Sequence, residues 1–347
     1  MRIAVDAMGG DHAPEEIVPG ALAAAEVVAA EVCLVGDENR LSELLARGRR
    51  AAHAADSPGQ VSIQHVDGVV EMDESPRAAL QRGRSSSLAT AVEMVRDGAA
   101  GAAVSAGNSG AFMALATMRL GSIANIDRPA IALLLPTIAG RMVFLDAGAN
   151  ADCRPEHLLQ FGIMGSCYAA VRGIANPSVG ILNIGEEASK GNAVTRAAYD
   201  LLQAAPLNFI GSVEGNSVFD GAVDVVVADG FVGNVVLKVM EGSFHMFRGL
   251  LKAGIASNWL SGVGAWLMKP AFAHLRQRCD WAAHGGALLL GVNGVCVVCH
   301  GRSSREAIKN AILQAATAVE QDITGRVRNS VLALAEPQPS AEVLSDT

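Results

Sequence analysis

The feature that most constrains the fold is a repeated alternation of a short β-branched run, a glycine-containing turn and a helical stretch. Strands that alternate with helices of about ten residues or more predict an α/β fold, with a largely parallel sheet and helices on both faces. The predicted strands are Arg2–Asp6, Val32–Val35, Val61–His65, Ala102–Ser105, Ala130–Leu135, Met142–Asp146, Val179–Asn183, Val223–Ala228 and Val295–Cys299. The predicted helices are Glu15–Ala30, Arg40–Arg47, Ser85–Val95 and Ala111–Leu120.

The composition indicates one large domain with a substantial core. Half of the 347 residues are apolar and only 18 % are charged, which is typical of a globular chain. We expect a single compact α/β catalytic domain over residues 1–330 and a flexible tail over residues 331–347, which is rich in proline, serine and acid from about Glu336. Gly48–Gln60 is predicted to be a surface loop. The net charge of −8 disfavours nucleic acid as a partner.

The N-terminus and the cysteines set the expected compartment and cofactors. Met1 leads directly into IAVDAMGGDHAP, without an apolar segment and small-residue cleavage site, so we expect a cytoplasmic protein with free thiols. Cys296, Cys299 and His300 spell the haem-attachment pattern CxxCH, but they end the run GALLLGVNGVCVVCHG, which is typical of a buried strand. No second pair has zinc-ligand spacing. We therefore expect no metal and no cofactor.

Polar residues and glycine follow six of the predicted strands. Ligands of open α/β sheets bind beyond the carboxyl ends of the strands, where glycine permits close backbone approach and helix N-termini attract anions. We expect these loops to form one pocket on a single rim, although ordinary turns with helix caps prefer the same residue types. The candidates are Gly9, Gly10, Asp11, Ser105, Gly107, Asn108, Ser109, Gly110, Asp146, Asn150, Glu186, Lys190, Asp229, Gly230, Asn234 and His300.

Familiar nucleotide and nucleophile motifs are missing from these loops. No GxGxxG or GxxxxGK[ST] follows a strand, which disfavours a dinucleotide site and a P-loop. Gly107-Asn108-Ser109-Gly110-Ala111 is similar to a nucleophile elbow but ends in alanine, so a hydroxyl or capping role for Ser109 is favoured over a nucleophilic one. Lys190 is the lysine of these loops, and either a phosphate contact or a solvated position near Glu186 and Glu187 fits its spacing.

Long motifs carry a resemblance to a known family. The run MRIAVDAMGGDHAPEEIVPGA resembles the opening of the bacterial phosphate acyltransferases (acyl-ACP:phosphate transacylases). The similarity continues through VSAGNSGA, LDAGANADCRPEHLLQF, DVVVADGFVGNVVLK and HGRSS, to about residue 325. It implies an enzyme that forms acyl phosphate from long-chain acyl-[acyl carrier protein] and inorganic phosphate, early in phospholipid synthesis.

The resemblance also implies a fold, an assembly and partners. The expected fold is like that of isocitrate/isopropylmalate dehydrogenases and phosphotransacetylases. The expected assembly is a homodimer that associates peripherally with the membrane surface. Acyl carrier protein is the expected donor partner, and a membrane glycerol-3-phosphate acyltransferase is the expected downstream partner.

Resemblance and physical chemistry together indicate a mechanism in which phosphate is itself the nucleophile. Such an enzyme must hold phosphate near the thioester carbonyl and stabilise the resulting oxyanion. Lys190, Asn108, Asn234 and His300 are the predicted catalytic residues, and loop N–H groups at 107–110 and 230–234 are expected to bind phosphate. The remaining candidates are expected to bind substrate, with Asp11, Asp146, Glu186 and Asp229 orienting the donors.

The segment at about 242–280 has a distinct composition. It is basic, lacks acidic residues before Asp280, and holds or adjoins all three tryptophans, which suits a membrane interface or an acidic carrier protein. Its glycines and Pro270 predict two short helices in a protruding hairpin, and an internal or dimer-packing hairpin is the alternative. An apolar stripe at i+4 spacing is expected along Leu251, Ile255, Trp259, Val263 and Leu267. The candidate docking residues are Arg248, Lys252, Trp259, Leu267 and Lys269.

Two other functions fit parts of the pattern. One is a phosphotransacetylase that acts on short-chain acyl-CoA. The other is a non-catalytic adaptor that binds carrier protein at the membrane, although an adaptor has no need of six glycine-containing polar strand ends.

Overall fold

A computed structural model describes residues 1–52, 59–81, 85–279 and 285–335. One sheet has the strand order β3-β2-β1-β4-β11-β10-β5-β6-β9-β7-β8. The strands are β1 Arg2–Asp6, β2 Glu31–Gly36, β3 Gln60–His65, β4 Ala102–Ser105, β5 Ala130–Pro136, β6 Arg141–Leu145, β7 Ser178–Asn183, β8 Asn208–Glu214, β9 Val225–Val227, β10 Ala287–Leu290 and β11 Val295–Val298. The helices are α1 Ile17–Ala25, α2 Glu38–Ala52, α3 Pro76–Gln81, α4 Ser87–Arg96, α5 Ser109–Leu120, α6 Pro155–Val171, α7 Ala193–Ala204, α8 Gly230–Ala256, α9 Trp259–Leu267, α10 Lys269–Cys279, α11 Arg305–Glu320 and α12 Ile323–Ala335.

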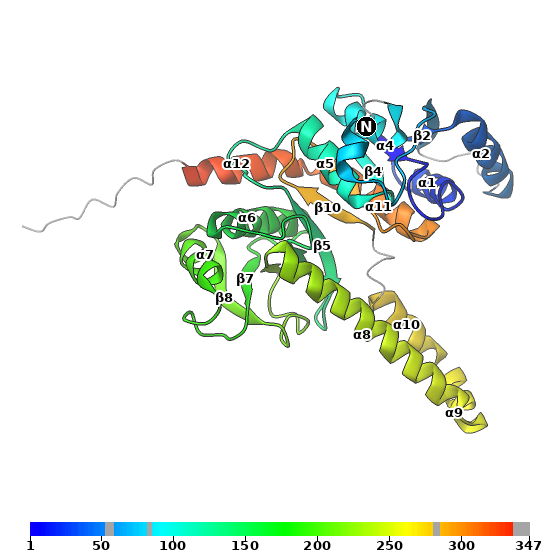
Figure 1. The fold of residues 1–347 in the computed structure, drawn as a ribbon. Coiled ribbons are helices and arrows are strands. Elements are labelled where there is room, and N and C mark those ends of the chain that lie inside the picture. The colour runs from blue at the N-terminus through cyan, green and yellow to red at the C-terminus, as the bar shows by residue number, and fades with distance from the viewer. Residues whose placement is uncertain (53–58, 82–84, 280–284, 336–347) are drawn as a thin grey trace, which may run out of the picture.

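Helices cover both faces of the sheet, as the sequence predicts. Apolar residues of α1, α6, α7, α11 and α12 form one core cluster with one face of the sheet. On the opposite face, α4 and α5 cover the N-terminal half and α8 covers the C-terminal half, each with its own cluster. Figure 1 shows these two halves, with the N-terminal strands above and α6, α7 and α8 below.

The sheet is largely parallel, but its direction reverses near the middle. β10 is antiparallel to both β11 and β5, and β5 is antiparallel to β6. Consequently β6, β9 and β7 run opposite to β1, β4 and β11. The expectation that all six strand ends share a single rim is therefore wrong, because the carboxyl ends of these two groups lie at opposite edges of the sheet.

The apolar run 285–300 forms two strands rather than the one predicted. β10 and β11 pair antiparallel around a turn that begins at Gly291, whose φ is 93° and whose added Cβ would press on Ile126 and Met164 at 3.0 Å. Cys296 and Cys299 are buried here, and burial raises the pKa of each thiol to about 12. These two, with Cys33, Cys153 and Cys167, are free thiols, as predicted.

Two helices extend farther than the sequence indicates. α2 continues through Ala52, so the loop predicted from Gly48 is helical up to that residue, and residues 53–58 lie outside the described part. α12 continues through Ala335, and Val331 is buried in the core, so a tail that starts at residue 331 is wrong. The stretch from Glu336 onward lies outside the described residues.

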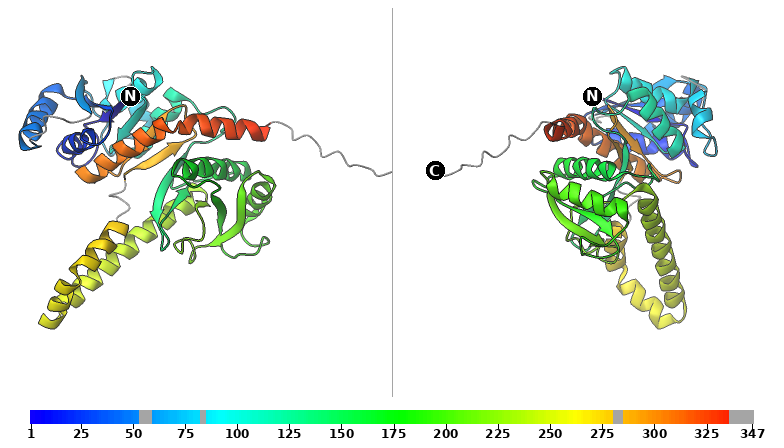
Figure 2. Two further views of the ribbon diagram at one scale, coloured as in Figure 1. Left: turned by 180° about the vertical axis from the view of Figure 1, so that it is seen from behind. Right: turned by 60° about the vertical axis from the view of Figure 1, so that its left-hand side comes forward.

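A helical hairpin protrudes from the C-terminal half of the molecule. α8 has 27 residues, begins against the sheet and runs outward, and α9 and α10 return from its tip (Figures 1 and 2). The prediction of two short helices misses this long first arm. The predicted stripe is broken at Ser257 and Asn258, where α8 ends and the Asn258 side chain caps α9. In the described residues, no helix is long and apolar enough to cross a bilayer.

Candidate active site

A cavity of about 410 Å³ lies between α5 and α8, on the face of the sheet that these two helices share. It exists because α5 and α8 cover opposite ends of that face and leave parts of β5, β10 and β11 between them. Its volume is within the usual range of small-molecule sites, about 300–1,000 Å³. The cavity is lined by Ser109, Gly110, Met113, Ile131, Leu133, Ala147, Gly148, Asn234, Leu237, Lys238, Glu241, Gly285, Gly286, Ala287, Val298, Cys299, His300 and Ser303.

Four predicted site residues line this cavity from three elements. Ser109 and Gly110 open α5, Asn234 lies in the second turn of α8, and His300 follows β11. The first N–H groups of a helix have no partner within it, so the start of α5 presents donors to an anion. The cavity therefore joins donors from both halves of the sheet, even though their strand ends lie at opposite edges.

The His300 ring is held in one orientation by the backbone. Its Nδ1 accepts a hydrogen bond from Arg302 N at 3.1 Å. In the neutral ring the proton must then be on Nε2, which makes Nε2 a hydrogen-bond donor. His300 is exposed at the cavity, and a donor of this kind suits a carbonyl or phosphate oxygen.

Asn108 caps α5, and its side chain is already occupied. Its Oδ1 accepts from Ala111 N, while its Nδ2 donates to the carbonyl oxygens of Met72 at 3.0 Å and Glu74 at 2.7 Å. This arrangement fixes the loop before α3 against the start of α5. The catalytic role of Asn108 stays a prediction, since it requires a donor that the loop now uses.

Asp6 and Ser105 hold the loops after β1 and β4 together. Ser105 Oγ donates to Asp6 Oδ2 at 2.7 Å and accepts from Gly107 N at 2.9 Å. A Cβ at Gly9 would lie 2.9 Å from the Gly107 backbone, so glycine is required for this approach. Burial raises the pKa of Asp6. Ser105, Gly9 and Gly107 thus shape the loops rather than line the cavity.

Asp146 organises the loop after β6. Its Oδ1 accepts from Ile131, Gly148 and Ala149 N–H groups, and its Oδ2 accepts from Asn150 N at 2.7 Å and Asn150 Nδ2 at 2.9 Å. Burial raises the pKa of Asp146, and these donated hydrogen bonds oppose that rise. This arrangement holds the backbone beside the cavity, and the predicted role of Asp146 in orienting donors to a substrate stays a prediction.

The start of α8 is packed onto the Asp146 loop. Asp229 caps the helix by accepting from Val232 N at 2.8 Å, and Gly230 N donates to Asn150 O at 2.8 Å. A Cβ at Gly230 would lie 2.7 Å from Asn150 N, and one at Gly233 would overlap Asp146 O. These contacts set the direction in which α8 leaves the sheet.

Other predicted residues lie outside the cavity lining. Lys190 and Glu186 are exposed in the loop between β7 and α7, at the edge where β7 ends. Asp11 is exposed, with one carboxylate oxygen 3.5 Å from Arg302 Nε, and Gly10 has a φ of 114° in the same loop. The roles assigned to these residues stay predictions.

Comparisons with known proteins identify the family. The family model described as "Fatty acid synthesis protein" matches residues 1–326. A phosphate acyltransferase from Pelotomaculum thermopropionicum is 50 % identical, over 95 % of this chain and 95 % of its own length. One from Desulfitobacterium hafniense (strain DSM 10664 / DCB-2) is 49 % identical, over 95 % of this chain and 98 % of its own.

The chain belongs to the phosphate acyltransferase family.

Solved structures confirm the fold expected for this family member. A phosphotransacetylase from Streptococcus pyogenes superposes with a TM-score of 0.62 at 17 % identity, covering 92 % of this chain and 94 % of its own. A 4-hydroxythreonine-4-phosphate dehydrogenase from Klebsiella pneumoniae superposes with a TM-score of 0.52 at 17 % identity, covering 91 % of this chain and 98 % of its own. At such identities the likeness concerns the fold alone. The phosphate acyltransferase relatives make the chain a transferase that acts in fatty acid or phospholipid synthesis.

Sequence reasoning missed two charged residues of the transferase's cavity. Lys238 and Glu241 line it from α8, four and seven residues after Asn234. That spacing places all three on one helix face, so a long helix predicted from Asp229 would have revealed them. The sequence pattern predicts a strand-end loop that ends at Asn234 and a hairpin that begins at about residue 242, and this part of the helix lies between the two.

The hairpin of this phosphate acyltransferase exposes apolar and basic side chains. Trp259 is 75 % exposed and Leu267 is 66 % exposed, and α9 has no buried residue among its nine. Arg248, Lys252 and Lys269 are also exposed. An apolar groove of about 820 Å³ lies at the base of the hairpin, with α8 and Leu275 of α10 among its walls.

Proposed function

We propose that the protein transfers a long-chain acyl group from acyl-[acyl carrier protein] to inorganic phosphate and releases acyl phosphate, early in phospholipid (phosphatidic acid) synthesis. The observation that supports this proposal most directly is the cavity between α5 and α8 in a chain whose relatives are named phosphate acyltransferases. The cavity presents helix N–H donors, an imidazole and an ammonium group within one space.

In the proposed reaction, a phosphate oxygen attacks the thioester carbonyl and the carrier-protein thiolate leaves. The start of α5 faces phosphate with N–H groups, which attract anions. Asn234 Nδ2 and His300 Nε2 are hydrogen-bond donors, and either one suits the oxyanion that forms on the carbonyl. Because phosphate is already a nucleophile, the site has only to position it, and positioning alone supplies a large acceleration.

We further propose that the enzyme is a homodimer whose hairpin rests on the membrane surface. Exposed tryptophan and leucine side chains with lysine and arginine nearby are typical of an interfacial contact. An acidic carrier protein is the alternative ligand for the same basic residues. A position at the membrane surface brings acyl phosphate close to a membrane glycerol-3-phosphate acyltransferase.

The decisive experiment supplies the purified protein with long-chain acyl-[acyl carrier protein] and phosphate and measures acyl phosphate. A parallel reaction with short-chain acyl-CoA tests the phosphotransacetylase alternative. We expect product with the carrier-protein donor and little with acyl-CoA. Absence of product with both donors would leave the adaptor function as the better account.

Lys190 lies outside the cavity lining, so the catalytic role that the sequence predicts for it needs a test of its own. Lys190→Ala is expected to reduce acyl phosphate formation severely while the unfolding midpoint stays unchanged, since its side chain is exposed. Turnover close to that of the unmodified protein would remove Lys190 from the site.

A further inference from the structure

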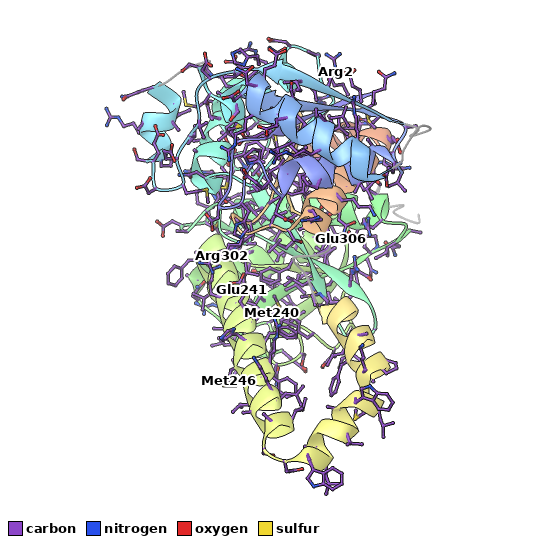
Figure 3. The ribbon with its side chains drawn as sticks, turned by 90° about the vertical axis from the view of Figure 1, so that its right-hand side faces the viewer. Arg2, Met240, Glu241, Met246, Arg302 and Glu306 are labelled. Atoms are coloured by element: carbon purple, nitrogen blue, oxygen red, sulfur yellow. The ribbon has the colours of Figure 1, made fainter. Side chains whose placement is uncertain are left out.

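Lys238 and Glu241 form an ion pair that faces the cavity. Lys238 Nζ lies 2.8 Å from Glu241 Oε2, and both side chains line the cavity together with Asn234. Figure 3 labels Glu241 on the part of α8 nearest the sheet, with Met246 farther out along the hairpin. The pair therefore belongs to the cavity end of α8 rather than to the protruding arm.

This pair supplies the full charges of the cavity. Among the described residues that line it, Lys238 is the single lysine or arginine and Glu241 is the single acid. The ammonium group of lysine is a compact point charge that suits a phosphate oxygen. A carboxylate beside it repels an anion at short range, so its presence in an anion site needs a reason.

Helix stability does not supply that reason. A glutamate before a lysine is the stabilising order in a helix, and here the lysine comes first. Glu306 and Lys309 of α11 have the stabilising order at the same spacing of three, outside the cavity lining. Lys238 is 57 % exposed, and an ion pair so exposed contributes little to folding.

The ion pair with Lys238 occupies only one carboxylate oxygen of Glu241. Its Oε1 is shielded from solvent and has no hydrogen-bond partner within the described residues. A shielded carboxylate oxygen that accepts no hydrogen bond is unfavourable, and the hydroxyl group of a ligand would supply the missing donor. Hydrogenphosphate carries such an O–H near neutral pH, whereas sulfate, of similar size and charge, carries none.

We propose that Lys238 and Glu241 select phosphate by its proton. The Lys238 ammonium group contacts a phosphate oxygen, and Glu241 Oε1 accepts the hydrogen of the phosphate O–H. Sulfate has no hydrogen to donate to the Glu241 carboxylate, so its oxygens are repelled by that carboxylate and sulfate is rejected. The inference rests on the proposed function for the identity of phosphate as substrate.

The test compares phosphate with sulfate in the full-length protein. Phosphorus NMR of inorganic phosphate with the protein alone reports binding, and sulfate is added as a competitor. We expect the unmodified protein to broaden the phosphate signal and sulfate to leave that broadening unchanged. Equal competition by sulfate would overturn the proposal without any variant.

The variants separate the two side chains. Glu241→Gln offers an amide N–H in place of an acceptor, so sulfate competition should strengthen about tenfold or more. Lys238→Met should raise the KM for phosphate about tenfold with kcat little changed, because it removes binding that ground and transition states share. Glu306→Gln and Lys309→Met, from the matched pair on α11, should change neither the sulfate competition nor the KM for phosphate. A Glu241→Gln protein that still rejects sulfate would overturn the selectivity role.

The two proposals fail differently. If no acyl phosphate forms with any donor but the binding assay still separates phosphate from sulfate, the proposed reaction is wrong and the selectivity stands. If acyl phosphate forms but the unmodified enzyme binds sulfate as tightly as phosphate, the proposed selectivity is wrong and the proposed reaction stands.

Discussion

Individual atoms around the cavity are placed by close backbone contacts that only glycine permits. Gly9 lies against Gly107, and Gly230 and Gly233 lie against the Asp146–Asn150 loop. The buried carboxylates Asp6 and Asp146 then bind the N–H groups of those loops. The two buried carboxylates are thus occupied with loop N–H groups, whereas the shielded Oε1 of Glu241 has no hydrogen-bond partner within the described residues.

Gly233→Ala should destabilise the protein strongly. The new methyl group would overlap Asp146 O, a backbone atom that cannot move without breaking the loop, so we expect a loss of at least about 2 kcal/mol in unfolding free energy. The matched control is Gly249→Ala in the same helix, where nothing lies within 4 Å. It should stabilise by about 0.5–1 kcal/mol, because alanine is the better helix former. Urea unfolding measures both, and a neutral Gly233→Ala would contradict the packing described.

The buried thiol of Cys296 should make stability fall at alkaline pH. Burial raises its pKa from 9.0 to about 12, so the stability it contributes is fully present below pH 9 and is lost as the pH rises toward 12. Between pH 8 and 10.5 the loss from this one group should be about 2 kcal/mol. Cys296→Ala should reduce the fall by that amount. Val297 is the adjacent buried residue. Val297→Ala should lower the unfolding free energy equally at pH 8 and pH 10.5, so the loss between these two pH values should stay the same.

Sequence reasoning at this scale identified many polar residues near the cavity but not their tasks. Asn108 and Ser105 are predicted to contact substrate, and that prediction stays open, but the sequence did not reveal that their side chains also bind neighbouring loops. Capping residues and ligand-binding residues are the same types at the same strand ends, so composition cannot separate them. Only the partners of each atom do so.

Whole elements follow the sequence where the apolar pattern is strong. β1, β4 and β7 lie where their apolar runs predict them, and α4 and α5 begin within two residues of the predicted starts. α8 was missed because its exposed apolar side chains and glycines obscure a helical pattern. Its long run links the cavity to the protruding tip.

Charging the tip should remove membrane association. In Trp259→Glu/Leu267→Glu, two carboxylates would enter the interface in place of two exposed apolar groups of α9. We expect liposome flotation of the unmodified protein and its loss in this variant. Val27→Glu/Met118→Glu is the control, since these side chains are 61 % and 68 % exposed on the body. If the Trp259→Glu/Leu267→Glu protein still floated with liposomes, carrier-protein docking would remain as the role of the hairpin.

The whole molecule is built around strands that come late in the chain. β10 and β11 lie between β4 and β5 and join the two halves of the sheet. The direction reversal at β10 could not be predicted, because the run that contains β10 and β11 was interpreted as a single strand. Pairing partners of short buried strands are a long-range property that local pattern does not contain.

Removing the central strands should prevent folding of the sheet. A chain that ends at residue 280 lacks β10, β11 and the two helices after them, and it leaves the edges of β4 and β5 unpaired. We expect no cooperative thermal transition and aggregation on purification. A chain that ends at Ala335 keeps every described element and should unfold at the temperature of the intact protein. A cooperative transition in the shorter chain would show that the halves fold independently.

The position of β10 and β11 also has a consequence for biosynthesis. About 190 residues separate the end of β4 from the end of β11, its partner in the sheet. At ribosomal rates of about 5–20 residues per second, β4 waits roughly 10–40 s for that partner. During that time the nascent chain carries two open strand edges, and we expect it to depend on chaperones more than a protein whose neighbouring strands are made in order.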